Sequence, residues 1–151
     1  MATSIFDKLR AGVTTRSAEE TRSLATELGA ALPAGSVLAL HGDLGVGKTT
    51  FVQGLARGLG VASGVTSPTF NIFTLHRGKT NLLHLDAYRL DSAREVEDLL
   101  IEDFMEPPWC LAVEWPEKVA AWLPAGALHL DLAIGPEHAH HVRLRAEKKS
   151  A

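Results

Sequence analysis

The residues Gly42-Asp43-Leu44-Gly45-Val46-Gly47-Lys48-Thr49 fit the pattern G-x-x-x-x-G-K-[ST] at every defined position. An apolar run, Val37 to Leu40, precedes them, and a predicted helix containing Thr50 to Leu55 follows them. Glycines in such a loop let the backbone wrap around phosphate oxygens, so that successive N–H groups point inward as an anion site. The strand, loop and helix together therefore predict a nucleoside triphosphate as the ligand.

The polar residues of this loop have separate expected roles. Lys48 adds a full positive charge, Thr49 offers a hydroxyl to magnesium, and the following helix directs its positive end at the same phosphates. The alternative is a glycine-rich turn that matches the pattern by chance. The strand before the loop and the helix after it argue against that alternative.

Length and composition limit the class of protein. The chain has 151 residues, of which 46% are hydrophobic and 22% charged, and its net charge is −3. We expect a single domain over residues 1–151, with poor order in residues 1–12 and 147–151. The charge lacks the basic excess that attracts nucleic acid directly. No apolar run approaches the ~18 residues that span a bilayer, and the lone Cys110 fits a reducing compartment, so we expect a cytoplasmic protein without membrane contact.

Hydrophobic periodicity predicts alternating helices and strands. A capping box, Ser17 with Glu20, precedes a helix that ends before Pro33. A second box, Ser92 with Glu95, precedes an apolar stripe at helical spacing, formed by Val96, Leu99, Leu100 and Phe104. Strands are expected at 37–40, 70–75, 82–85, 111–113, 128–134 and 142–145, with the second and third forming a hairpin. The pattern predicts an α/β fold of the P-loop NTPase kind, in three layers, with a mixed twisted sheet flanked by helices.

Two acidic residues follow predicted strands, Asp86 after 82–85 and Glu114 after 111–113. Ligands of open α/β sheets bind at the carboxyl ends of strands, so both carboxylates could reach one magnesium ion. A Glu in this place can also take a water ligand or orient an attacking water. The simpler alternative is that each residue caps the turn or helix that follows it.

Four segments, in order and spacing, resemble a known family. They are Gly42 to Thr50, Thr66-Ser67-Pro68-Thr69-Phe70, His84-Leu85-Asp86-Ala87-Tyr88-Arg89-Leu90 and Glu114-Trp115-Pro116-Glu117. Together they look like TsaE, the bacterial P-loop ATPase family required for tRNA threonylcarbamoyladenosine biosynthesis, and the resemblance runs from about Ser17 to Arg145. The chain departs from the family at Ala87, where a larger apolar residue is common, and in the helix from Ser92, which lacks the usual glycine.

The resemblance implies a Mg2+-dependent ATPase, slow alone, that joins TsaB and TsaD and acts as a nucleotide switch on that pair. The transfer chemistry would belong to TsaD, and tRNA would be contacted only through the complex. Thr49 and Glu114 would hold magnesium, with Asp86 supporting the metal site. The residues implied to act in hydrolysis are Glu114, Asp86, Lys48 and Thr66. Those implied to contact ATP are Ser17, Asp43, Leu44, Gly45, Val46, Gly47, Lys48, Thr49 and Thr50.

Several of these residues also have simpler explanations. Thr66 resembles part of a switch loop, yet Thr-Ser-Pro-Thr is also good turn chemistry. Ser17 lies near the family's adenine pocket, but helix capping could explain it entirely. Trp115 could shield the site, face a partner or belong to the core.

The histidines permit two metal hypotheses. His84 alternates with Asp86 on one strand face, but the resemblance assigns only Asp86 to magnesium and leaves His84 as a supporting contact. His138, His140 and His141 could suggest zinc, yet no Cys or acidic partner completes a ligand set. A solvated loop is the favoured interpretation of those three.

Two other functions stay open. A small-molecule kinase would need an acceptor site and an arginine-bearing lid, which the sequence does not show clearly, although Arg89 and Arg94 lie near a loop. A nucleotide-gated interaction module would bind ATP without hydrolysing it. A GTPase is weaker, because no Asn-Lys-x-Asp segment is present.

Overall fold

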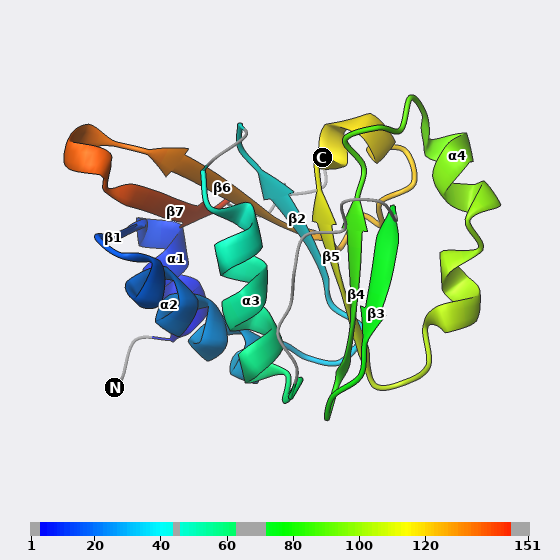
Figure 1. Ribbon diagram of the computed structural model, residues 1–151, viewed down its shortest axis with the longest axis horizontal. Coiled ribbons are helices and arrows are strands. Elements are labelled where there is room, and N and C mark those ends of the chain that lie inside the picture. Colours follow the sequence, from blue (N-terminus) through cyan, green and yellow to red (C-terminus); the bar gives the residue numbers. More distant parts are fainter. Residues whose placement is uncertain (1–3, 44–45, 63–71, 146–151) are drawn as a thin grey trace.

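The computed structural model describes residues 4–43, 46–62 and 72–145 (Figure 1). The helices and short 3-10 helices (η) are α1 (Ile5–Ala11), α2 (Ala18–Ala31), α3 (Lys48–Gly58), α4 (Ala93–Asp98), η1 (Ile101–Phe104), η2 (Pro116–Val119) and η3 (Pro136–His138). The strands are β1 (Val13–Thr15), β2 (Val37–His41), β3 (Phe73–His76), β4 (Asn81–Asp86), β5 (Trp109–Glu114), β6 (Leu128–Ile134) and β7 (His140–Leu144).

Within the described residues the strands form one seven-stranded sheet in the order β1-β7-β6-β2-β5-β4-β3. β2 runs parallel to both β5 and β6, and β4 runs parallel to β5. β3, at one edge, pairs antiparallel with β4, which confirms the predicted hairpin, and β7 pairs antiparallel with β6 and β1. Because β2, β4 and β5 are parallel, their carboxyl ends reach the same edge of the sheet.

Each face of the sheet packs against its own hydrophobic core. On β5, Cys110 and Ala112 pack with residues of α1, α2 and α3, whereas Leu111 and Val113 pack with residues of α4, η1 and η2. Successive side chains of a strand point to opposite faces, so one strand supplies both cores. This arrangement of helix layers on either side of a mixed sheet is the predicted three-layer α/β fold (Figure 1).

Helix α2 confirms the first predicted cap. The Ser17 hydroxyl accepts a hydrogen bond from the Glu20 N–H at 3.1 Å, and it lies 3.5 Å from the Glu20 carboxylate. α3 follows the loop as predicted and is succeeded by Gly60, whose φ of 79° is the left-handed conformation expected after a helix.

The expectation of poor order in residues 1–12 is wrong for residues 5–11, which form α1. The Ser4 hydroxyl accepts a hydrogen bond from the Asp7 N–H and caps this helix. Ile5 and Leu9 are buried in the core beside α2 and α3, and that burial stabilises a helix too short to form alone. Residues 147–151 lie outside the described residues.

The second predicted helix is also corrected, because residues 93–104 form two short helices rather than one. Ser92 makes no side-chain cap, and Leu100 has a left-handed backbone with φ of 54° between α4 and η1. Val96 and Ile101 are both fully buried, although residues five apart in one continuous α-helix lie about 140° apart around it. The break brings both into one core and leaves Leu100 and Phe104, two members of the predicted apolar stripe, exposed.

Candidate functional site

The start of α3 has the features of an anion site. Gly47 occupies the N-cap position with φ of 94°, no side chain caps the helix, and no acidic residue lies in its first turn. The early N–H groups of a helix have no partner within it, so this end can bind an anion. Thr49 and Thr50 lie in this first turn and are half-buried.

The loop before the helix follows a path that requires glycine at Gly42. Its φ is 148°, and a Cβ atom there would lie 2.6 Å from the carbonyl oxygen of Leu132. Farther along, the N–H of Val46 donates weakly to the carbonyl of Asp43 at 3.4 Å. Two loop residues expected to contact the nucleotide, Leu44 and Gly45, lie outside the described residues.

Lys48 extends from α3 back across this loop. Lys48 is buried, with 5% of the residue exposed, and its Nζ donates to the Gly42 carbonyl at 2.8 Å and lies 3.8 Å from the centre of the Trp115 ring. Burial lowers the pKa of Lys48, while the carboxylates of Glu114 and Asp86 oppose that shift. The ammonium group therefore lies near the two predicted acidic residues, at the mouth of the loop.

Asp86 and Glu114 are the last residues of β4 and β5, and the two strands pair them directly. The Tyr88 N–H donates to Asp86 Oδ1 at 3.0 Å, and burial raises the pKa of Asp86. Glu114 is 5% exposed. Carboxylate and hydroxyl oxygens are ligands that Mg2+ prefers, so Asp86 and Glu114, with Thr49 in the nearby first turn, form a donor set that suits this ion.

His84 contacts Glu114 from the neighbouring strand. Its Nε2 lies 2.5 Å from Glu114 Oε2, and both side chains are buried. In the part of the chain that the structure describes, Nδ1 of His84 is buried without a hydrogen-bond partner. A proton on Nε2 lets the ring donate a hydrogen bond to this carboxylate, which only accepts. The structure thus places His84 as a support for Glu114.

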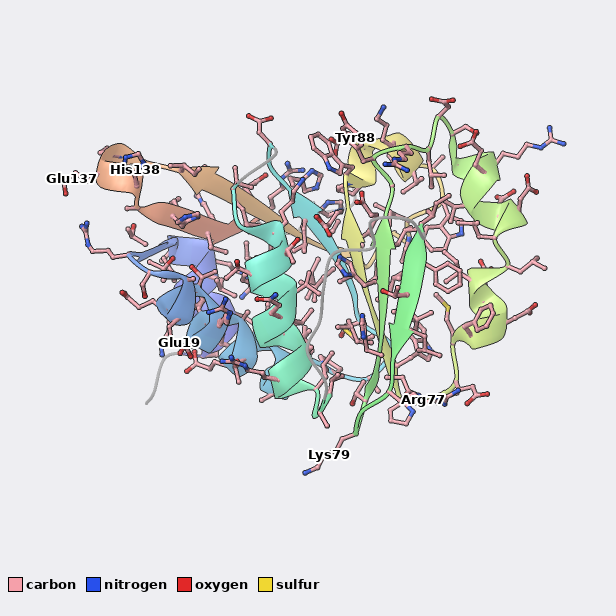
Figure 2. The ribbon with its side chains drawn as sticks, in the orientation of Figure 1. Glu19, Arg77, Lys79, Tyr88, Glu137 and His138 are labelled. Carbon is pink, nitrogen blue, oxygen red and sulfur yellow. The ribbon has the colours of Figure 1, made fainter. Side chains whose placement is uncertain are left out.

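Trp115 lies beside the lysine in a strained conformation. Its φ of 57° is left-handed, which is uncommon for a bulky residue and frequent at functional sites. The Tyr88 ring packs against it with centroids 5.1 Å apart, and Tyr88 is 49% exposed. Figure 2 shows Tyr88 at the end of the sheet where β4 and β5 terminate. Trp115 therefore covers Lys48 on its inner side and meets an exposed aromatic residue on its outer side.

The remaining predicted site residues differ in position. Ser17 lies two residues after Thr15, the last residue of β1, and its hydroxyl caps α2. Thr66 lies outside the described residues. Among residues that sequence reasoning did not assign to the site, His140 contacts the loop, its Nδ1 lying 3.0 Å from the Val46 carbonyl. The cluster of histidines at 138–141 is the sequence feature that marks this position, but the expectation of a solvated loop is wrong for His140.

Neither metal hypothesis for the histidines gains support. No group of three His, Cys, Asp or Glu residues suited to a metal occurs in residues 4–43, 46–62 and 72–145. His141 instead lies 3.3 Å from the hydroxyl of Thr14, and Figure 2 shows His138 at the outer tip of the β6–β7 hairpin. Over the same ranges, no helix has both the length and the apolar character needed to cross a membrane.

A parallel-sheet core, a glycine-rich loop after β2 and a buried lysine at the start of α3 define an α/β protein of the phosphate-loop class. The family model described as threonylcarbamoyl adenosine biosynthesis protein TsaE matches residues 15–143. The chain belongs to this family.

Individual relatives agree with the family assignment. The tRNA threonylcarbamoyladenosine biosynthesis protein TsaE of Treponema pallidum is 39% identical over 119 residues, which are 79% of this chain and 88% of that protein. The protein of the same name from Bacillus subtilis is 40% identical, over 74% of this chain and 70% of its own length. The crystal structure of Bacillus subtilis YdiB is similar with a TM-score of 0.73 and 30% identity, covering 91% of this chain and 85% of that one.

Proposed function

We propose that this chain is the ATP-binding and ATP-hydrolysing subunit of tRNA threonylcarbamoyladenosine biosynthesis, acting in the cytoplasm as a single domain. The observation that supports this most is the meeting of a buried lysine and two strand-end carboxylates, Asp86 and Glu114, at the uncapped start of α3. Family membership supplies the pathway. TsaB and TsaD are the proposed partners, with tRNA reached only through them.

In the proposed transfer of the phosphoryl group to water, different residues of the chain have different roles. Lys48, freed from the Gly42 carbonyl, would neutralise phosphate oxygens, and the loop and first-turn N–H groups would hold them. Thr49, Asp86 and Glu114 would hold Mg2+, which supplies charge neutralisation at the phosphate oxygens when bound. Glu114 would also orient the attacking water, directly or through the metal shell, while His84 fixes its carboxylate. Thr66 would complete the site from the segment outside the described residues.

In this proposal the chain hydrolyses ATP slowly without its partners, as a switch does, rather than rapidly as a metabolic enzyme does. In this proposal, bound ATP and hydrolysed ATP give the chain different surfaces toward the TsaB–TsaD pair. Tyr88 is a candidate for transmitting the difference, because it is half exposed and packs on the Trp115 ring that covers Lys48.

Phosphate release from ATP tests the proposal, measured for the chain alone and with TsaB and TsaD. Glu114→Gln keeps the shape of the side chain but removes its charge, so we expect binding of ATP with turnover reduced by about 100-fold or more. Glu106→Gln is the matched control, since this side chain is 71% exposed and lies just before β5, away from the site. The control should hydrolyse ATP like the wild type.

Equal partner-stimulated turnover in Glu114→Gln and the wild type would remove Glu114 from the mechanism. ATP binding without hydrolysis in the wild type, alone or with partners, would favour the nucleotide-gated module instead. A phosphorylated nucleoside or small alcohol among the products would favour a kinase.

A further inference from the structure

His140 connects an edge of the sheet to the phosphate loop. It is the first residue of β7, and its Nδ1 lies 3.0 Å from the Val46 carbonyl, 94 positions earlier in the chain. The ring also packs on the next residue, because a Cβ atom on Gly47 would lie 3.3 Å from the same nitrogen. The imidazole therefore contacts the Val46 carbonyl and lies close to Gly47.

The chemistry of this contact fixes the direction of the peptide. A carbonyl oxygen only accepts hydrogen bonds, so Nδ1 of His140 is the protonated nitrogen. In a planar trans peptide the C=O and N–H bonds point in opposite directions. With the Val46 carbonyl held toward His140, the Gly47 N–H must point away from β7, which leaves it available to an anion at the loop.

This peptide needs such a restraint. Gly47 has φ of 94°, a region that glycine enters without a Cβ penalty, so the peptide before it can rotate more freely than most. The backbone bond from Val46 to Asp43 is long, at 3.4 Å, and restrains the loop weakly. His140 itself is held firmly, because its backbone is paired with Thr15 of β1 on one side and Ile134 of β6 on the other.

We infer that His140 is a positioning residue for nucleotide binding: it orients the Val46–Gly47 peptide so that the Gly47 N–H faces the phosphates. This inference rests on the proposed function. Among the described contacts, His140 is the residue through which β7 touches the backbone of the loop. The inference also gives a role to a histidine in a segment that the sequence predicts to be a solvated loop.

Calorimetric titration with ADP and Mg2+ tests the inference. His140→Leu keeps bulk but removes the donor, and loss of one neutral hydrogen bond should weaken ADP binding about threefold to tenfold. The amide nitrogen of His140→Asn can occupy the place of Nδ1, so this variant should bind within about twofold of the wild type. His141→Leu is the control, because His141 contacts Thr14 rather than the loop. Melting temperatures without nucleotide should stay close to that of the wild type in all three variants.

ADP binding by His140→Leu equal to the wild type would overturn the inference. So would equal weakening by the Leu and Asn variants together with lower melting temperatures, because that result describes a structural residue. Lys48→Ala separates the two proposals. If this variant binds ADP much more weakly than the wild type while His140→Leu does not, only the role of His140 fails. If the wild type binds no nucleotide, the proposed function fails and the inference fails with it.

Discussion

The contact between His84 and Glu114 joins two buried polar groups on neighbouring strands. A buried carboxylate is costly unless it is hydrogen-bonded, and His84 Nε2 at 2.5 Å is the donor that satisfies it. The pair therefore has two consequences. It stabilises the end of β5, and it fixes the carboxylate that the proposed mechanism uses.

His84→Leu should lower the free energy of unfolding by about 3 kcal/mol, because it leaves Glu114 buried without its donor. Glu114→Leu should also destabilise the protein, but the double variant should lose less than the sum, since two apolar residues can pack together. Urea unfolding without nucleotide measures the free energy of unfolding of the wild type, the two single variants and the double variant. Additivity within about 0.5 kcal/mol would show that the two side chains are not energetically coupled.

The residues of the site were predictable to different extents. Lys48 and the strand-end carboxylates can be predicted from local patterns, because the P-loop pattern identifies the lysine and the ends of predicted parallel strands identify the carboxylates. His84 is expected to be a supporting contact, but the partners of the two supporting histidines do not follow from local patterns. His84 lies 30 residues from Glu114 and His140 lies 94 from Val46, so only the assembled sheet brings each pair together. A single sequence contains no periodicity that reports such pairs.

At the scale of elements, helices α2 and α3 pack unusually closely and fix the position of the phosphate loop. Figure 1 shows the two helices side by side. A Cβ atom on Gly54 would lie 2.3 Å from the carbonyl oxygen of Arg22, and one on Gly58 would lie 2.3 Å from that of Thr26. The Thr26 hydroxyl also donates across the interface to the Gly54 carbonyl at 3.0 Å. Glycine is therefore needed on α3 because backbone meets backbone.

Gly54→Ala should destabilise the protein by about 1–2 kcal/mol. Alanine is favoured over glycine inside a helix by about 1 kcal/mol, but here the added methyl group forces the helices apart, and overpacking costs about 1–3 kcal/mol or more where backbone cannot yield. Gly126→Ala is the control, because nothing lies within 4 Å of its would-be Cβ. Thermal unfolding should separate the two, and an unchanged Tm in Gly54→Ala would contradict the close packing.

Elements with a long periodic pattern were predictable, and short elements that depend on tertiary contacts were not. The helix at 18–31 and the strands at 37–41 and 128–134 have their own caps or apolar patterns. β1 has only three residues and exists through pairing with β7, while the break at Leu100 serves burial of Val96 and Ile101. Local propensity does not predict the strand β1 or the break at Leu100, because each depends on contacts with residues elsewhere in the chain.

At the scale of the whole molecule, two histidines, His41 at the end of β2 and His76 at the end of β3, should make stability depend on pH. His41 ends β2 and stacks on His129 with ring centroids 5.1 Å apart. Burial lowers the pKa of His41, Arg145 and His129 lower it further, and Asp131 and Glu117 oppose them. Burial and the neighbouring His84 lower the pKa of His76.

Both histidines bind a proton less readily in the folded protein than in the unfolded chain, where the ordinary pKa is 6.5. As the pH falls below about 7.5, the unfolded state takes up more protons than the folded state. The free energy of unfolding therefore decreases as the pH falls, and above about pH 7.5 these two histidines no longer change it. Each histidine can contribute a slope of at most ~1.4 kcal/mol per pH unit. Urea unfolding at pH 8.0, 7.0, 6.0 and 5.5 measures it. This range lies above the pH at which Asp131, with its lowered pKa, loses its own contribution.

The double variant His41→Gln/His76→Gln should flatten the dependence, because glutamine does not titrate. A wild-type protein equally stable at pH 5.5 and 8.0, or a double variant with the full wild-type slope, would contradict the assignment. The location of the two residues gives the result a further use. His41 directly precedes Gly42 of the phosphate loop, whereas His76 is the last residue of β3, so the single variants show how much of the pH dependence comes from the histidine beside the loop.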